Sequence, residues 1–251
     1  MANPLMDHEI KALKEMGKIR QEAIDQMLVD DLMPNEWRLA CQMVVRAFDA
    51  WMRAKPVDIG NTIRRNLITY RRTGNPVGPL YKHDAGNGAA MRILPVALAA
   101  LGSTESTACD ATRAQAHVTH NNPVSDAACE FIVPAVQDFL RVVYRQRIAP
   151  FIAAHPEFAF RRRRCQNPSG WIVDTMQAVL QSLLETDSVE SCLIDVVNRG
   201  GDAGSTGAIA GMLAGALYGR RSIPQRWEKV LDPGVRTACL FQATALASCR
   251  S

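Results

Sequence analysis

The sequence feature that most constrains the fold is a glycine-rich stretch near the C-terminal end, residues 198–219. It begins with a turn, N-R-G-G-D-A-G, and continues into an apolar run where glycine recurs every four residues, at Gly207, Gly211, Gly215 and Gly219. Glycine costs a helix interior about 1 kcal/mol relative to alanine, so this many must serve another purpose. Four-residue spacing places them on one helical face, where a neighbouring backbone can approach closely. The stretch therefore predicts a buried central helix in an all-helical protein.

The turn places Asp202, Ser205 and Thr206 at the N-terminal end of this helix, and three interpretations stay open. Free backbone N–H groups there could bind an anion such as phosphate. Asp202 and a hydroxyl could instead bind a hard cation. In the simplest interpretation, Ser205 caps the helix and Asp202 favours its dipole. A phosphate-binding P-loop is excluded because no lysine precedes the hydroxyls, and no strand-like run suggests a dinucleotide-binding fold.

The overall composition excludes several classes of protein. The 251 residues are 47% hydrophobic, which is enough to form the core of one domain. The net charge is +4 and aromatic residues make up only 6%, so the arginine-rich segments 141–147 and 161–164 do not indicate a nucleic-acid partner. The seven cysteines are odd in number and form no C-x-x-C pair. With neither a signal peptide nor an apolar run of about 20 residues, we expect a cytoplasmic protein with reduced thiols and no transmembrane segment.

A second glycine-rich turn precedes another apolar segment. The polar connection 71–88 ends in H-D-A-G-N-G, and residues 89–101 are expected to form a buried helix. Asp84, Asn87 and their neighbouring amides would then lie at the start of that helix. A carboxylate, an amide and free N–H groups suit a polyhydroxylated or phosphorylated ligand, whereas an ordinary Asx-type turn is the simpler alternative. Two such turns in one chain favour a ligand site.

Hydrophobic periodicity predicts helices along the whole chain and no strand. The expected helices are 7–29, 36–54, one capped by Asn61 or Thr62 and running to Tyr70, 89–101, 111–118, 125–146, 171–185, 189–197, the glycine-rich helix, a short helix from Ile223 and a tail from Val235. Residues 148–170 are expected to be irregular. We divide the chain into a divergent helical segment, 1–35, and a helical domain, 36–251, which together form one compact domain.

Five motifs in matching order resemble those of the ADP-ribosylglycohydrolase family. They are P-V-D-I-G-N-T at 56–62, D-A-G-N-G-A-A-M-R-I-L-P at 84–95, T-H-N-N-P-V-S-D-A-A at 119–128, W-I-V-D-T at 171–175, and the glycine-rich stretch. The resemblance implies an orthogonal all-helical bundle that hydrolyses the N-glycosidic bond between ADP-ribose and an arginine side chain. It is strongest to the branch that acts on dinitrogenase reductase, and it implies that protein as the partner in the control of nitrogen fixation.

The resemblance also implies site residues in both glycine-rich turns. Asp84, Gly86, Asn87 and Gly88 match the family's ADP-ribose loop, with Asp84 acting at the ribose. Asp202 matches both a catalytic and a metal-ligand position.

Three further positions complete the implied site. Ser205 matches a metal ligand beside the aspartate of the second turn, and the family's centre is dinuclear, with Mn²⁺ or Mg²⁺. His120 matches a histidine that lines the ligand cleft. Trp171 stands where an aromatic ring flanks the ribose or the adenine.

The sequence departs from the family pattern at its metal ligands. The family's D-A-D-T has its second aspartate replaced by Gly204, and its N-terminal glutamate and T-D-D-T segment have no counterpart. Upstream, Asp30 and Asp31 form the only aspartate pair, and Asp58 lies in another motif. The chain thus looks as if it lacks the N-terminal metal-binding unit, and weak or absent metal binding is expected.

Three hypotheses follow from this mixture of matches and departures. The chain is a working hydrolase, or a relative that binds ADP-ribose or a modified protein without cleaving it, or a truncated or frame-shifted reading of an active enzyme's gene. All three share one structural expectation, that the two glycine-rich turns meet across a cleft for an ADP-ribosyl group.

Overall fold

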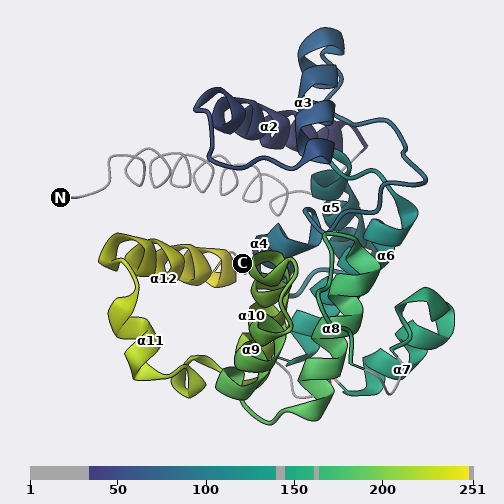
Figure 1. Cartoon of the computed structure of the whole chain (residues 1–251). Coiled ribbons are helices and arrows are strands. Elements are labelled where there is room, and N and C mark those ends of the chain that lie inside the picture. Colours follow the sequence, from purple (N-terminus) through teal and green to yellow (C-terminus); the bar gives the residue numbers. More distant parts are fainter. Residues whose placement is uncertain (1–33, 140–144, 161–163, 249–251) are drawn as a thin grey trace.

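The computed structural model describes residues 34–139, 145–160 and 164–248, which form helices joined by loops (Figure 1). No strand occurs among these residues, and the only β-type pairing described is an isolated bridge between Gly86 and Trp171. The predicted all-α fold class is therefore confirmed. The predicted helix 7–29 and the pair Asp30 and Asp31 lie outside the described residues.

The helices follow one another along the chain and are joined by connections of very different length. They are α2 (Pro34–Arg53), α3 (Asn61–Thr73), η1 (Ala90–Arg92), α4 (Leu94–Ala99), α5 (Glu105–His117), α6 (Pro123–Phe139), α7 (Arg145–Ala154), η2 (Pro156–Phe158), α8 (Ile172–Glu185), α9 (Val189–Asn198), α10 (Ala203–Tyr218), η3 (Arg220–Ser222), α11 (Gln225–Val230) and α12 (Pro233–Ser248).

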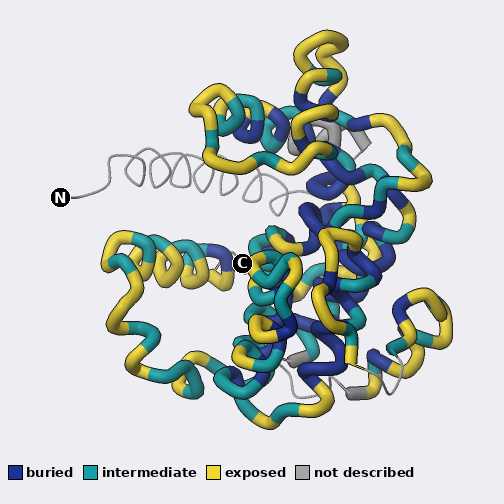
Figure 2. Tube along the Cα trace, in the orientation of Figure 1, coloured by how far each residue is buried: buried dark blue, intermediate teal, exposed yellow. Residues whose placement is uncertain are grey.

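The main hydrophobic core forms where α10 packs against α6, α8 and α9. Its fully buried side chains include Ile132, Met176 and Leu213, and in Figure 2 buried residues run along much of α6 and α8. A second, smaller core joins α2, α3 and α5 around Val45 and Leu67. The first glycine-rich turn lies just before η1, and its Ala85 belongs to the main core.

The glycine stripe of α10 packs less closely than its spacing predicts. A Cβ at Gly207 would lie 3.4 Å from Val197 of α9, whereas one at Gly215 would meet nothing within 4 Å. The buried residues of α10 are Thr206, Ile209, Ala210, Leu213 and Ala214. The helix is thus central, as predicted, but it is buried on one face only, and Gly207 and Gly211 face side chains of α9 rather than a neighbouring backbone.

Proline accounts for two wrong helix predictions. Residues 89–101 form η1 and α4 rather than one helix, and Pro95 lies in the first turn of α4. Proline has no N–H, so it can begin a helix but interrupts the bonding of one already formed. Residues 148–170 are not wholly irregular, because α7 continues to Ala154 despite Pro150, and η2 follows it.

The predicted cap of α3 is also wrong. The residue at the N-cap is Gly60, and no side chain makes a capping hydrogen bond there. The hydroxyl of Thr62 is used instead in a contact with Asp84. By contrast, Ser188 caps α9 with its side chain and forms a capping box with Ser191.

Two further properties concern the chain as a whole. None of the described helices is long and apolar enough to cross a membrane. The six described cysteines are all free, in agreement with the expectation of reduced thiols.

Candidate functional site

The two glycine-rich turns meet at a single side chain, that of Asn87. Its Nδ2 donates to Oδ2 of Asp202 at 2.8 Å and to Oγ1 of Thr175 at 3.0 Å. An amide nitrogen carries two protons, so both are used in these bonds. Asn87 and Thr175 are buried, and Asp202 is partly buried. The two turns therefore meet, as predicted, and the N-terminal ends of α8 and α10 both take part in the contact; the cleft expected between the turns stays a prediction.

Residues 167–172, which lead into α8, bridge the two turns with their backbone. The carbonyl oxygen of Gly170 accepts from the N–H of Asn87 at 2.9 Å, and that of Pro168 accepts from the N–H of Asp202 at 2.7 Å. Trp171 lies in this segment, and 49% of its surface is exposed. The bridge therefore presents an indole ring to solvent beside the contact between the turns.

The second turn requires glycine at two positions. Gly200 and Gly201 have φ angles of +77° and +61°, in the left-handed region. A Cβ at Gly201 would also lie 2.3 Å from the carbonyl oxygen of Pro168. These constraints turn the chain sharply and leave Asp202 as the residue that precedes α10.

The carboxylate of Asp202 holds the polar residues of its own turn. Its Oδ1 accepts from the Ser205 hydroxyl at 3.0 Å, and its backbone oxygen accepts from the Thr206 hydroxyl at 2.7 Å. No side chain makes a capping hydrogen bond at the start of α10, so the interpretation of Ser205 as a cap is wrong. Ser205 lies within the first turn of α10, and its hydroxyl donates to the carboxylate of Asp202. A capping side chain would instead accept a hydrogen bond from a backbone N–H.

The first turn is built against the ring of His120. A Cβ at Gly88 would lie 2.6 Å from Cε1 of this ring, and one at Gly86 would lie 3.0 Å from Nε2. His120 is buried, and burial together with the nearby Arg92 guanidinium lowers its pKa to about 3. The ring is therefore neutral at physiological pH, and only glycine leaves it room beside the loop.

Asp84 is held on the α3 side of the first turn. The Thr62 hydroxyl lies 3.0 Å from each of its carboxylate oxygens, and Arg65 forms an ion pair with it. The Arg65 guanidinium also stacks on Tyr81, with Cζ 3.9 Å from the ring centre. Thr62 and Arg65 could not be recognised from the sequence as partners of the Asp84 carboxylate. They lie 22 and 19 residues from Asp84, and no periodicity predicts a contact over that separation.

The described residues do not fit the predicted dinuclear metal centre. Asp202 and Ser205 together offer oxygens for one hard cation. In the part of the chain that the structure describes, no group of three or more His, Cys, Asp or Glu side chains could hold a metal ion. The position of the family's second aspartate is Gly204, where an added Cβ would meet nothing within 4 Å.

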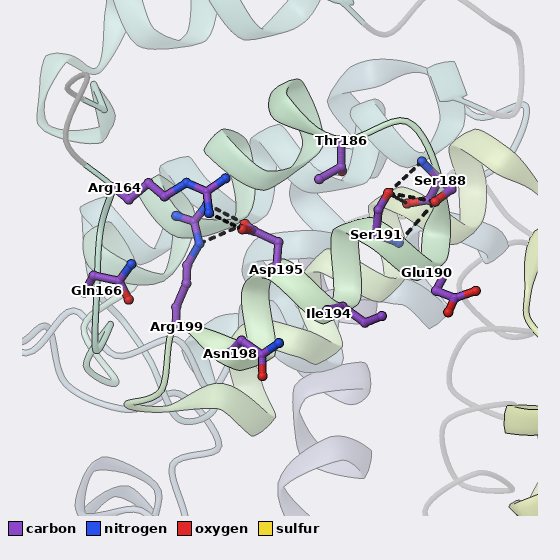
Figure 3. A pocket seen from close by; sticks show the side chains of 10 residues that line it. All are labelled: Arg164, Gln166, Thr186, Ser188, Glu190, Ser191, Ile194, Asp195, Asn198 and Arg199. Carbon is purple, nitrogen blue, oxygen red and sulfur yellow. Dashed lines mark hydrogen bonds and ion pairs between the residues drawn. The ribbon is translucent and has the colours of Figure 1, made fainter.

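A separate cavity of about 680 Å³ lies along α9, and its lining includes Asn198 and Arg199, which directly precede the glycines of the second turn. In Figure 3 the side chains of Arg164 and Arg199 converge on Asp195. Their Nη atoms lie 2.7 Å and 2.6 Å from its two carboxylate oxygens. None of the site residues implied by the family resemblance lines this cavity. Because Arg199 is buried and directly precedes Gly200, we attribute to this ion pair the anchoring of the second turn.

The model of the ADP-ribosylglycohydrolase family matches residues 23–248 of this chain. A solved structure described as an ADP-ribosylglycohydrolase-related protein complex superposes with a TM-score of 0.71 and covers 95% of this chain and 100% of its own. Their sequence identity is 23%, so this likeness concerns the fold alone.

Two kinds of characterised relative are similar in sequence. The chain is 43% identical over 207 residues to the ADP-ribosyl-[dinitrogen reductase] glycohydrolase of Rhodospirillum rubrum, which is 81% of this chain and 70% of the relative. It is 30% identical over 181 residues to the ADP-ribosylarginine hydrolase Tri1 of Serratia proteamaculans (strain 568), which is 68% of this chain and 49% of the relative. The chain therefore spans about half the length of the Tri1 relative.

Proposed function

The chain belongs to the ADP-ribosylglycohydrolase family, and from that premise we propose that it removes ADP-ribose from an arginine side chain of a modified protein. The observation that carries the proposal is the 43% identity over 81% of the chain with the Rhodospirillum rubrum glycohydrolase. The proposed target is accordingly dinitrogenase reductase, and the proposed role is its reactivation in the control of nitrogen fixation.

In this proposal the ADP-ribosyl group binds where the two turns meet. The backbone of residues 86–88 and the ring of His120 contact the ADP-ribose, and the exposed indole of Trp171 stacks on its ribose or adenine. The contact between Asn87 and Asp202, at 2.8 Å, supports this placement because it brings both turns to one point.

The proposed reaction is hydrolysis. Water adds to the anomeric carbon of the ribose, the bond to the guanidine nitrogen breaks, and that nitrogen takes up a proton. Asp84 acts at the ribose, and Asp202 is the acceptor that orients a ribose hydroxyl or the attacking water. The proposed cofactor is Mn²⁺ or Mg²⁺, and since the described residues contain no group of three or more His, Cys, Asp or Glu side chains that could hold a metal ion, we expect weak uptake.

A specific observation favours a second candidate function, the binding of ADP-ribose or a modified protein without cleavage. Gly204 stands where the family has a carboxylate, and the described residues contain no cluster that could hold a metal ion. A hard cation poorly neutralised by carboxylates binds weakly. In this alternative the chain keeps the ADP-ribose cleft and has lost turnover.

One set of measurements tests both candidates. The full chain is titrated with ADP-ribose and, separately, with Mn²⁺ by calorimetry, and release of ADP-ribose is followed from ADP-ribosylarginine and from ADP-ribosylated dinitrogenase reductase. Release that is abolished by Asp202→Asn and unchanged by Asp110→Asn, an exposed residue of α5, supports the hydrolase. Binding without release supports the second candidate.

A gain-of-function variant sharpens the distinction. Gly204→Asp restores the family's second aspartate at a position where the new side chain has space. We expect tighter Mn²⁺ binding in this variant, and faster release if the missing carboxylate limits turnover. A chain that binds neither ADP-ribose nor a modified protein, with or without this substitution, contradicts both candidate functions.

A further inference from the structure

Arg92, the last residue of η1, joins the first glycine-rich turn to the segment that carries the site histidine. Its Nη1 donates to the carbonyl oxygen of Gly88 at 2.9 Å, and its Nη2 donates to Oγ1 of Thr119 at 2.7 Å. Its Nε donates to Oε1 of Gln115 at 2.8 Å, and its Cζ lies 4.6 Å from the centre of the Phe48 ring. The guanidinium is thus fixed on several sides while it contacts both the loop and Thr119.

These contacts determine where the protons of the neighbouring groups lie. A guanidinium has only donors, so Oγ1 of Thr119 accepts from Arg92 and its own proton is free to be donated. Thr119 is fully buried, and Nδ1 of His120 lies 2.8 Å from Oγ1. In the described part of the chain no other acceptor is found for this hydroxyl. The hydroxyl therefore donates to Nδ1, and Nδ1 carries no proton.

The second nitrogen of the ring faces the first glycine-rich turn. A Cβ built at Gly88 would lie 2.9 Å from Nε2 of His120, and one built at Gly86 would lie 3.0 Å from it. In a neutral imidazole whose Nδ1 accepts a hydrogen bond, Nε2 carries the proton. The groups that set the charge of this ring are Arg92 and Arg65, which disfavour its protonation, and Asp84, which favours it; burial has the largest influence and keeps the ring neutral.

We infer that Arg92 and Thr119 are positioning residues, which hold His120 as the neutral ring with its proton on Nε2, directed as a donor at the face of residues 86–88. The bound group that this donor meets is an oxygen of the ADP-ribosyl moiety, a part of the inference that rests on the proposed function. The assignment explains why a buried histidine can serve in a ligand cleft without becoming charged, since it acts as a fixed hydrogen-bond donor.

The tautomer is measured directly on the intact protein. Two-bond ¹H–¹⁵N correlation spectra of the histidine-labelled full chain distinguish the two ring nitrogens, and the signals of His120 are identified by their loss in His120→Gln. The expected result is a neutral ring protonated on Nε2 that does not titrate between about pH 5 and pH 8. A ring protonated on Nδ1, or one that titrates in this range, overturns the inference.

Two matched variants test the role of the hydroxyl. Thr119→Val removes the donor at nearly constant volume, and Thr119→Ser keeps it. We expect Thr119→Val to produce a mixture of tautomers and to weaken ADP-ribose binding about tenfold, and Thr119→Ser to preserve both properties. Equal losses in the two variants overturn the positioning role.

The two claims fail separately. If the wild-type chain binds no ADP-ribose, the proposed function fails, while the tautomer spectrum still decides the inference about Arg92 and Thr119. The position of the proton is read from the wild-type spectrum, and His120→Gln serves only to identify which signals belong to His120.

Discussion

The two glycine-rich turns need glycine for different reasons. At Gly201 of the second turn the obstacle is backbone, because an added Cβ would lie 2.3 Å from the carbonyl oxygen of Pro168 and φ is +61°. At Gly88 of the first turn the obstacle is a side chain, the ring of His120, 2.6 Å from an added Cβ. A carbonyl held by the Asp202 N–H cannot move aside, whereas a ring can tilt. The second turn is fixed by the fold, and the first is shaped around the proposed ligand site.

The largest effect is expected for Gly201→Ala. The substitution combines a left-handed backbone conformation with a collision against main-chain atoms, so we expect a loss of about 3 kcal/mol of unfolding free energy. Urea denaturation measures it. The matched control is Gly204→Ala, three residues on, where an added Cβ meets nothing and helix propensity predicts a gain of up to about 1 kcal/mol. If Gly201→Ala lost no more unfolding free energy than Gly204→Ala, the claim that main-chain atoms require glycine at position 201 would be wrong.

The next effect concerns His120 and pH. Burial and the nearby Arg92 lower the pKa of His120 to about 3 in the folded protein, from 6.5 in the unfolded chain. Below pH 6.5 the unfolded state therefore binds more protons than the folded state. Stability should therefore fall by about 2 kcal/mol between pH 6.5 and pH 5, and this contribution should be constant above pH 6.5. Denaturation at several pH values should show a shallower slope in His120→Gln than in the wild type. Parallel slopes would mean that the ring is not buried in neutral form.

A smaller loss of stability is expected for Gly88→Ala. The methyl group forces the His120 ring to shift, at a cost of about 1–2 kcal/mol. Because the obstacle is a side chain, the double variant Gly88→Ala with His120→Ala should recover part of that cost in a double-mutant cycle. The cycle should show no such coupling between Gly201→Ala and His120→Ala. Coupling in both pairs, or in neither, would contradict the proposed difference between the turns.

The smallest change in stability is expected for Trp171→Ala. The side chain is about half exposed, and the segment contacts the first turn through its backbone, so we expect a change within about 0.5 kcal/mol. ADP-ribose binding should nevertheless weaken about fivefold or more, and Trp171→Phe should preserve most of it. Calorimetry together with thermal denaturation separates the two effects. A loss of stability without a loss of affinity would make Trp171 a structural residue.

Much of the fold could be predicted from hydrophobic periodicity because the helices are amphipathic and end at recognisable residues. Helices α8 and α9 follow the predicted ranges closely. Errors in the helix ranges include those at Pro95, which lies in the first turn of α4, and at Pro150, which lies inside α7, and the start of α5, which is Glu105 rather than residue 111. A proline can begin a helix or stand within one, and tertiary packing decides which occurs.

The site could be predicted only in part. Motif order located both turns, and the contact between Asn87 and Asp202 confirms that they meet. The partners of each site residue could not be predicted, because Thr62, Arg65 and Arg92 act across helices rather than along one. From the sequence, the hydroxyls of Thr62 and Ser205 were predicted to cap helices. In the structure they donate hydrogen bonds to the carboxylates of Asp84 and Asp202 instead.

The hydrogen bond from Asn87 to Asp202 joins residues that are 115 positions apart in the chain. During synthesis, the first turn therefore leaves the ribosome long before its partner exists. Closing so large a loop costs entropy that only the completed packing of α8, α9 and α10 can offset. A nascent chain that stops short of Gly200 carries the first turn without the acceptor that holds the Asn87 amide, so any affinity for the proposed ligand should appear late in synthesis and all at once.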